Sequence, residues 1–120
     1  MFPAPGPARW TALRRQALAD GILDAGVLIR YESLRPEGER SPDWVARQAT
    51  RVTAGLDALE READGFAAEP SIGEITVGCC LGWLEFRKPT GEWRVEHPKL
   101  AAWYETFARR PSMVATPPDA

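Results

Sequence analysis

The chain has 120 residues, a length that fits one domain with an ordinary hydrophobic core. Its 15 Lys and Arg residues against 17 Asp and Glu residues give a formal net charge of −2, so no overall positive field favours binding to nucleic acid or to an acidic membrane. No stretch approaches the roughly 20 apolar residues of a membrane span, and the first residues do not resemble a signal peptide, so we expect a cytoplasmic protein.

Residues 1–8 (MFPAPGPA) contain three Pro and one Gly and are predicted to form an irregular, linker-like lead-in. Pro7 suits the first turn of a helix. From about Arg9 to Glu32 apolar residues recur at steps of three and four, which predicts a long helix. A helical domain is therefore predicted over residues 9–120.

A second helix is predicted after the charged loop SLRPEGERSP. Ser41 can act as its N-cap, Pro42 fits its first position, and Asp64-Gly65 ends it. Glu60 and Asp64 lie in its last turn, where negative charge opposes the helix dipole. This end of the helix is therefore not expected to be stable by itself.

The third helix begins with a capping box formed by Ser71 and Glu74. The run ITVGCCLGWLEF that follows is almost entirely apolar or small, which is typical of a central, buried helix. Gly73, Gly78 and Gly82 lower helix propensity, so their recurrence predicts close contact with neighbouring helices. A phosphate-binding loop is excluded, because these glycines lie inside a helix and not between a strand and a helix.

The two cysteines, Cys79 and Cys80, are adjacent in this run. Adjacent residues on a helix point about 100° apart and cannot form an unstrained disulfide. Metal binding needs more ligands than these two. We therefore expect both to be small buried side chains.

A fourth helix is predicted to start at His97-Pro98 and to stop at Arg109-Arg110-Pro111, with a short last turn beginning at Ser112. No alternating pattern predicts a strand. The predicted fold is all-α, with four to five helices in one bundle.

Few residues offer catalytic chemistry. His97 is the only His, so a His-based triad or a His-rich metal site cannot form within one chain, and its place before Pro98 fits a helix entry. Asp20 and Asp24 lie one turn apart and could perform acid–base chemistry if burial raised one pKa, although solvation or pairing with Arg is the commoner role. No catalytic residue and no metal site are predicted.

Basic and aromatic side chains could likewise have either a ligand-binding or a structural role. The doublets Arg14-Arg15 and Arg109-Arg110 could hold an anion, but surface salt bridges are the commoner role. The Trp and Tyr residues, Tyr31 among them, mostly sit at core spacing. Trp10 is the exception, because an aromatic at the start of the first helix would cover a partner domain or line a pocket.

Three stretches resemble the C-terminal helical domain of the glutathione S-transferase superfamily: PSIGEITVGCCLGWLEF its central helix, HPKLAAWYETFARRPS the segment after it, and RRQALADGILDAGVLIRYESLRPEGERSPDWVARQ the first two helices of a bacterial branch. Together they span nearly the whole chain. Family members often have Asp where this chain has Glu74, a departure that preserves the capping chemistry. The resemblance implies a bundle that follows a thioredoxin-like domain, and MFPAPGPARW resembles the end of the linker between the two.

The resemblance also implies roles for residues. Trp10, Leu13, Arg14 and Ala17 would line the pocket for the electrophile, and Asp20 would contact glutathione bound to a partner subunit. Glutathione is the family's cosubstrate, and the thioredoxin-like domain, missing from this sequence, carries the group that activates its thiol. The resemblance further implies that a homodimer could form partly through the first two helices, and because the missing domain normally supplies part of that contact, the oligomeric state stays open.

Two functions fit these features. The first is the electrophile-pocket and dimerisation domain of a glutathione transferase, inactive without the thioredoxin-like domain. The alternative is a stand-alone protein-interaction module on the same helical fold, in which exposed residues such as Trp10 and Leu13 bind a partner protein.

Overall fold

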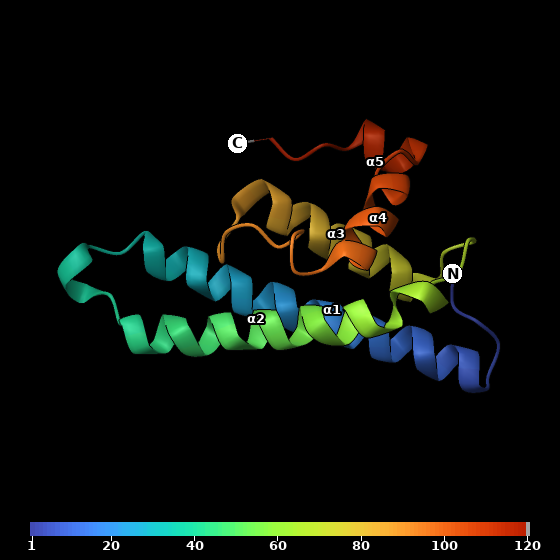
Figure 1. Ribbon diagram of the computed structural model, residues 1–120, viewed down its shortest axis with the longest axis horizontal. Coiled ribbons are helices and arrows are strands. Elements are labelled where there is room, and N and C mark those ends of the chain that lie inside the picture. The colour runs from blue at the N-terminus through green and yellow to red at the C-terminus, as the bar shows by residue number, and fades with distance from the viewer. Residues whose placement is uncertain (120) are drawn as a thin grey trace.

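The computed structural model describes residues 1–119, which form helices and connecting loops without any strand (Figure 1). The α-helices are α1 (Pro7–Ser33), α2 (Pro42–Glu62), α3 (Ile72–Arg87), α4 (Pro98–Phe107) and α5 (Pro111–Ala115), and short 3-10 turns lie at Glu37–Glu39 and Ala63–Gly65. These five α-helices confirm the predicted all-α fold. Ala120, the last residue of the predicted domain 9–120, lies outside the described residues.

The long helix α1 packs against both α2 and α3 and so forms the centre of the bundle. Figure 1 shows α1 and α2 side by side along the long axis, joined by the loop at residues 34–41, with α4 and α5 beside α3. The hairpin of α1 and α2 extends past α3 at this loop, which contributes to an elongated shape of 50 × 30 × 24 Å. None of the helices in residues 1–119 is long and apolar enough to cross a membrane.

The predicted helix starts are confirmed by their capping contacts. The Ser41 hydroxyl accepts a hydrogen bond from the Trp44 amide at 3.3 Å, and Pro42 is the first residue of α2. At α3 the Glu74 carboxylate accepts from the Ser71 amide at 3.1 Å, and the Ser71 hydroxyl accepts from the Gly73 amide at 3.2 Å. These contacts satisfy amides that have no partner inside the helix.

The core contains side chains from the first four helices. Its largest fully buried side chains are Ile22, Val52, Leu59, Val77, Cys80, Leu81, Leu84 and Leu100. Close helix contacts occur at glycines, as predicted for α3. A Cβ atom at Gly73 would lie 2.9 Å from the Ala12 carbonyl oxygen, one at Gly78 would overlap the Phe107 ring, and one at Gly82 would lie 3.0 Å from the Tyr104 hydroxyl.

Two predictions about burial were wrong. Cys80 is fully buried, and burial raises the pKa of its thiol to about 12, but Cys79 is exposed, because the next residue of a helix points about 100° away. Tyr31, predicted at core spacing, is 64% exposed. Ile29 and Glu32 are buried on one side of α1, and Tyr31 lies on the opposite side, which faces solvent.

The acidic end of α2 is stabilised by a contact that local sequence does not reveal. Glu60 accepts hydrogen bonds from the amides of Lys99 and Leu100 at 2.9 Å each, and the Lys99 ammonium donates to Asp64 at 2.8 Å. These amides belong to the first turn of α4, where negative charge is favourable. Glu60 therefore caps α4 from a neighbouring helix.

We expect Gly78→Ala to lower the free energy of unfolding by about 1–3 kcal/mol, because the added methyl group overpacks the contact with Phe107. Urea titration at pH 7 measures this change. Gly21→Ala is the matched control: a Cβ atom there would meet nothing within 4 Å, so helix propensity should stabilise this variant by up to about 1 kcal/mol. Equal stability of the two variants would contradict the close contact at Gly78.

Candidate functional site

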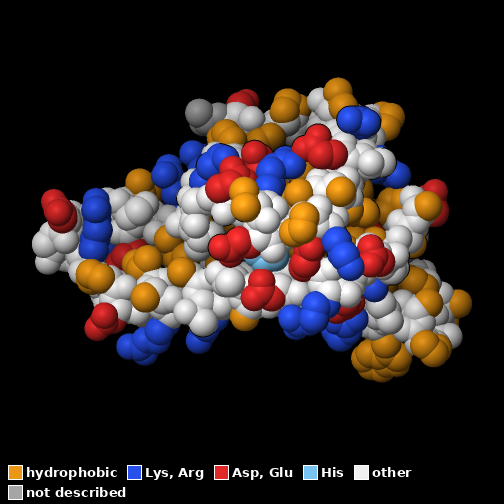
Figure 2. All heavy atoms as spheres, viewed as in Figure 1, with side chains coloured by type: hydrophobic (Ala, Val, Ile, Leu, Met, Phe, Trp, Pro, Cys, Tyr) orange, Lys and Arg blue, Asp and Glu red, His pale blue; other side chains and the backbone are white. Residues whose placement is uncertain are grey.

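The four residues predicted to line a pocket lie together at the start of α1. Trp10, Leu13, Arg14 and Ala17, with Thr11, line one shallow hollow of about 490 Å³. The Trp10 side chain is 74% exposed, in agreement with its prediction as the exposed aromatic. Figure 2 shows hydrophobic side chains gathered at the end of the molecule where α1 begins.

Arg14, the one cation among the residues lining this hollow, is already paired. Its two terminal nitrogens donate to the two carboxylate oxygens of Glu62 at 2.7 and 2.6 Å. The hydrogen bond from Arg14 lowers the pKa of Glu62 to about 2, against the opposing effect of burial, and the bond from Arg15 adds to the lowering. Glu62 is therefore ionised at neutral pH and neutralises the charge of Arg14.

The neighbouring Arg15 is buried and not at the surface, so the prediction of a surface salt bridge was wrong for this half of the doublet. Its Nε donates to Glu62 at 2.9 Å, one terminal nitrogen donates to Glu74 at 3.4 Å, and its guanidinium lies over the Phe66 ring. Burial raises the pKa of Glu74, but hydrogen bonds from Ser71 and from the Ala67 amide outweigh burial and lower it. Arg15 thus joins α1 to α2 and α3.

The carboxylate pair of the first helix has no geometry for acid–base catalysis. Asp20 and Asp24 are exposed, and within residues 1–119 neither forms a hydrogen bond or an ion pair. This arrangement fits the solvated role, in which both carboxylates face water.

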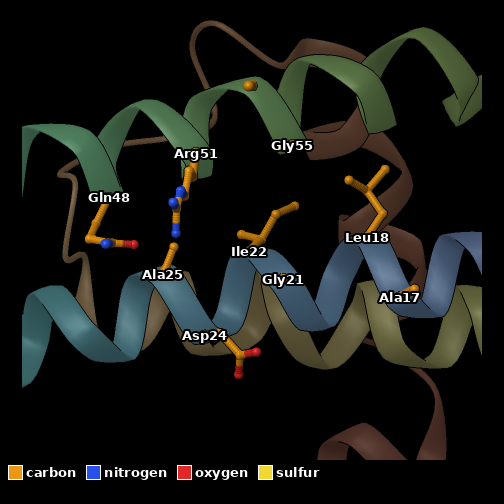
Figure 3. Close-up of a pocket in the computed structure, with 10 residues that line it drawn as sticks. Ala17, Leu18, Gly21, Ile22, Asp24, Ala25, Gln48, Arg51 and Gly55 are labelled. Atoms are coloured by element: carbon orange, nitrogen blue, oxygen red, sulfur yellow. The ribbon is translucent and has the colours of Figure 1, made fainter.

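A second concavity lies between α1 and α2, with a volume of about 530 Å³ (Figure 3). Its lining is mainly small and apolar: Ala17, Leu18, Gly21, Ile22, Ala25, Ala54 and Gly55. Asp24, Gln48 and Arg51 add polar groups, and Figure 3 shows Gln48 and Arg51 extending from α2 toward α1, while Asp24 points away from α2. Gln48 is 5% exposed, and its side-chain oxygen is buried without a hydrogen-bond partner in the described chain.

His97 has a structural role, as its place at a helix entry predicted. It is buried at the start of α4, with Nδ1 2.8 Å from the Trp93 carbonyl oxygen and Nε2 2.7 Å from an Asp57 oxygen. Residues 1–119 contain no cluster of three or more His, Cys, Asp or Glu side chains placed to hold a metal ion.

Glu62 and the groove residues Gln48 and Arg51 are the parts of these surfaces that the sequence did not identify. Glu62 contacts Arg14 across 48 positions of the chain, and no local motif signals such a pairing. The groove depends on how closely α1 and α2 approach. Gly55 permits that approach, because a Cβ atom there would overlap the Ile22 side chain.

Comparison with known proteins shows which proteins this chain is similar to. The family model described as "Glutathione S-transferase, C-terminal domain" matches residues 42–106. A curated relative, the uncharacterized GST-like protein YibF of Escherichia coli, is 35% identical over 106 residues. That match covers 86% of this chain and 52% of the relative, so the chain spans about half of the relative's length.

Solved structures match over nearly the whole chain. A glutathione transferase family member from Pseudomonas fluorescens, with bound glutathione, is 45% identical with a TM-score of 0.94, and the match covers 99% of this chain and 59% of that one. A glutathione S-transferase from Methylobacterium radiotolerans, in complex with glutathione sulfonate, is 35% identical with a TM-score of 0.88, and the match covers 98% of this chain and 57% of that one.

Acid is expected to remove the stability that Glu62 contributes. The folded-state pKa of about 2 lies below the ordinary value of 4.5, so this contribution is complete above pH 4.5 and is lost as the pH falls toward 2. The shift corresponds to about 3 kcal/mol, which the partial exposure of the carboxylate reduces to about 1–2 kcal/mol.

Urea unfolding of the parent chain and of Glu62→Gln between pH 7 and pH 2 measures this contribution. The difference in free energy of unfolding between the two proteins should be largest near neutral pH and should shrink steadily below pH 4.5. A difference that stays constant down to pH 2 would contradict the role of the ionised carboxylate.

Proposed function

Because this chain belongs to the glutathione S-transferase family, as its C-terminal helical domain, we propose that residues 9–120 form the half of a glutathione transferase that binds the electrophile. The observation that supports this proposal is the hollow at the start of α1, which is lined by the exposed Trp10 together with apolar and small side chains. Exposed apolar surface of this kind marks a ligand or domain contact, and a volume of about 490 Å³ suits a small molecule.

Conjugation of glutathione to an electrophile needs a group that activates the glutathione thiol, and we assign this group to another domain. A thiol reacts as its thiolate, which needs a nearby cation or hydrogen-bond donor to lower the thiol pKa. In the hollow the strongest such donor is Arg14, and Glu62 already accepts its hydrogen bonds. We therefore assign thiol activation to a thioredoxin-like domain that packs against the start of α1. The family members crystallised with glutathione or an analogue support glutathione as the cosubstrate.

The interaction-module alternative is not favoured. The chain matches a glutathione transferase family member over 99% of its length at 45% identity, which favours a role within a transferase. The exposed Trp10 and the partly buried Leu13 then have a role within the transferase and need no unrelated partner.

A second copy of this chain is the partner that the groove between α1 and α2 suits. A two-fold interface must be self-complementary, and the groove carries an acidic residue on one wall, Asp24, and a basic residue on the other, Arg51. Two antiparallel copies can pair these charges twice around an apolar centre. Such a dimer leaves the exposed Asp20 available to accept a hydrogen bond from the ammonium group of glutathione bound to the partner subunit.

A chimera tests the electrophile pocket. Fusing this chain in place of the matched region of the Pseudomonas fluorescens family member should give a protein that conjugates glutathione to 1-chloro-2,4-dinitrobenzene above the uncatalysed rate. In that chimera Trp10→Ala should lower kcat/KM for the electrophile about tenfold, because an aromatic contact worth about 1.4 kcal/mol is lost. The KM for glutathione should stay within about twofold, since glutathione binds elsewhere.

The matched control is Tyr31→Ala, which removes another exposed aromatic of α1 that lies outside the hollow. This variant should behave like the parent chimera. If the chimera binds glutathione and Trp10→Ala leaves electrophile kinetics unchanged, the hollow is not the electrophile pocket.

Charge reversal tests the dimer. Arg51→Glu and Asp24→Arg should each weaken self-association of this chain at least tenfold in sedimentation equilibrium, because each places like charges in contact across the two-fold axis. Combining both changes should restore association, since the pairs re-form with opposite sign. Arg61→Glu, which reverses an exposed charge of α2 outside the groove, serves as the control. Association that depends equally on all three positions would reject this interface.

A further inference from the structure

The electrostatics of the hollow are set by a residue that does not line it. Glu62 extends from the last turn of α2 and holds both ends of the Arg14 guanidinium, at 2.7 and 2.6 Å. The same carboxylate accepts a hydrogen bond from Arg15 at 2.9 Å, so both arginines bind to Glu62. Glu62 is absent from the hollow's lining, which comprises Trp10, Thr11, Leu13, Arg14 and Ala17.

The pairing lowers the hollow's affinity for anions. A guanidinium recognises a carboxylate or sulfonate best through two parallel hydrogen bonds, and Glu62 accepts such a pair from the two terminal nitrogens of Arg14. An anionic ligand would either displace Glu62 from this pair or bind the remaining N–H groups of a guanidinium whose charge Glu62 already offsets. It would also approach an ionised carboxylate, since the pKa of Glu62 lies at about 2. The remaining lining is apolar or uncharged.

We propose that Glu62 determines specificity by occupying Arg14, so that the hollow selects neutral, apolar electrophiles over those that carry a carboxylate or sulfonate group. This inference rests on the proposed function of the hollow as the electrophile pocket. Removing the charge of Glu62 frees Arg14 and converts the same hollow into a site that accepts an anion beside an apolar ring.

Two fluorescent probes with one ring system test the selection on this chain directly. N-phenyl-1-naphthylamine is neutral, and 8-anilinonaphthalene-1-sulfonate adds a sulfonate to the same skeleton. The parent chain should bind the neutral probe more tightly. In Glu62→Gln the affinity for the sulfonate should rise about tenfold, while the affinity for the neutral probe stays within about twofold, and added salt should reduce the gain.

Three variants separate specificity from a merely structural role of Glu62. The double variant Arg14→Gln with Glu62→Gln should lose the gain, because the freed cation is gone. Glu62→Asp, which keeps the charge but shortens the side chain, should give an intermediate gain, and it serves if Glu62→Gln does not fold. Arg14→Gln alone should lower the affinity for the sulfonate further below that for the neutral probe, because the ionised Glu62 then lies beside the hollow without the charge of Arg14 to offset it.

Trp10→Ala places the probe, since it should weaken binding of the neutral probe about tenfold if the probe lies in the hollow that Trp10 lines. A neutral probe that does not bind there would overturn the electrophile pocket and this inference together. A probe that binds there, with no change in preference in Glu62→Gln or Glu62→Asp, would overturn the role of Glu62 alone.

Discussion

The buried guanidinium of Arg15 constrains the whole end of the bundle that carries the hollow. A cation removed from water must be matched by carboxylates, because its desolvation costs several kcal/mol. Glu62 of α2 and Glu74 of α3 provide this match at 2.9 and 3.4 Å. Since Glu74 also caps α3, one connected set of charges fixes the end of α2 and the start of α3 against α1. The hollow lies beside these charged side chains. Its shape therefore depends on ion pairs that are not themselves part of its lining.

Features encoded within a few residues of the chain could be predicted. Ser41-Pro42 and the Ser71–Glu74 pair locate two helix starts, because capping is a contact across one turn. Trp10, Leu13 and Ala17 recur at steps of three and four, which places them on one side of a helix, and the structure gathers them around a single hollow. The spacing of Gly73, Gly78 and Gly82 likewise indicated close contacts, although it did not reveal which helix supplies each one.

Features that depend on distant segments could not be predicted. The acidic end of α2 was judged unfavourable because only its own helix was visible, whereas Glu60 caps α4 across 39 and 40 positions. Tyr31 is exposed because it lies on the side of α1 opposite to the buried Ile29 and Glu32, and which side is buried depends on where the other helices pack. The pairing of Arg14 with Glu62 has the same origin, so the charge of the hollow became visible only in three dimensions.

The glycine contacts also limit how the chain can change in length. Gly55 faces Ile22, Gly73 faces Ala12, and Gly78 faces Phe107, each at a separation that no side chain could occupy. Inserting or deleting one residue within a helix would rotate the residues after it by about 100°. This rotation would turn a glycine away from its contact and bring a side chain into it. Insertions and deletions among related sequences should therefore concentrate in residues 34–41 and 88–97, while the helices between them keep a fixed number of residues.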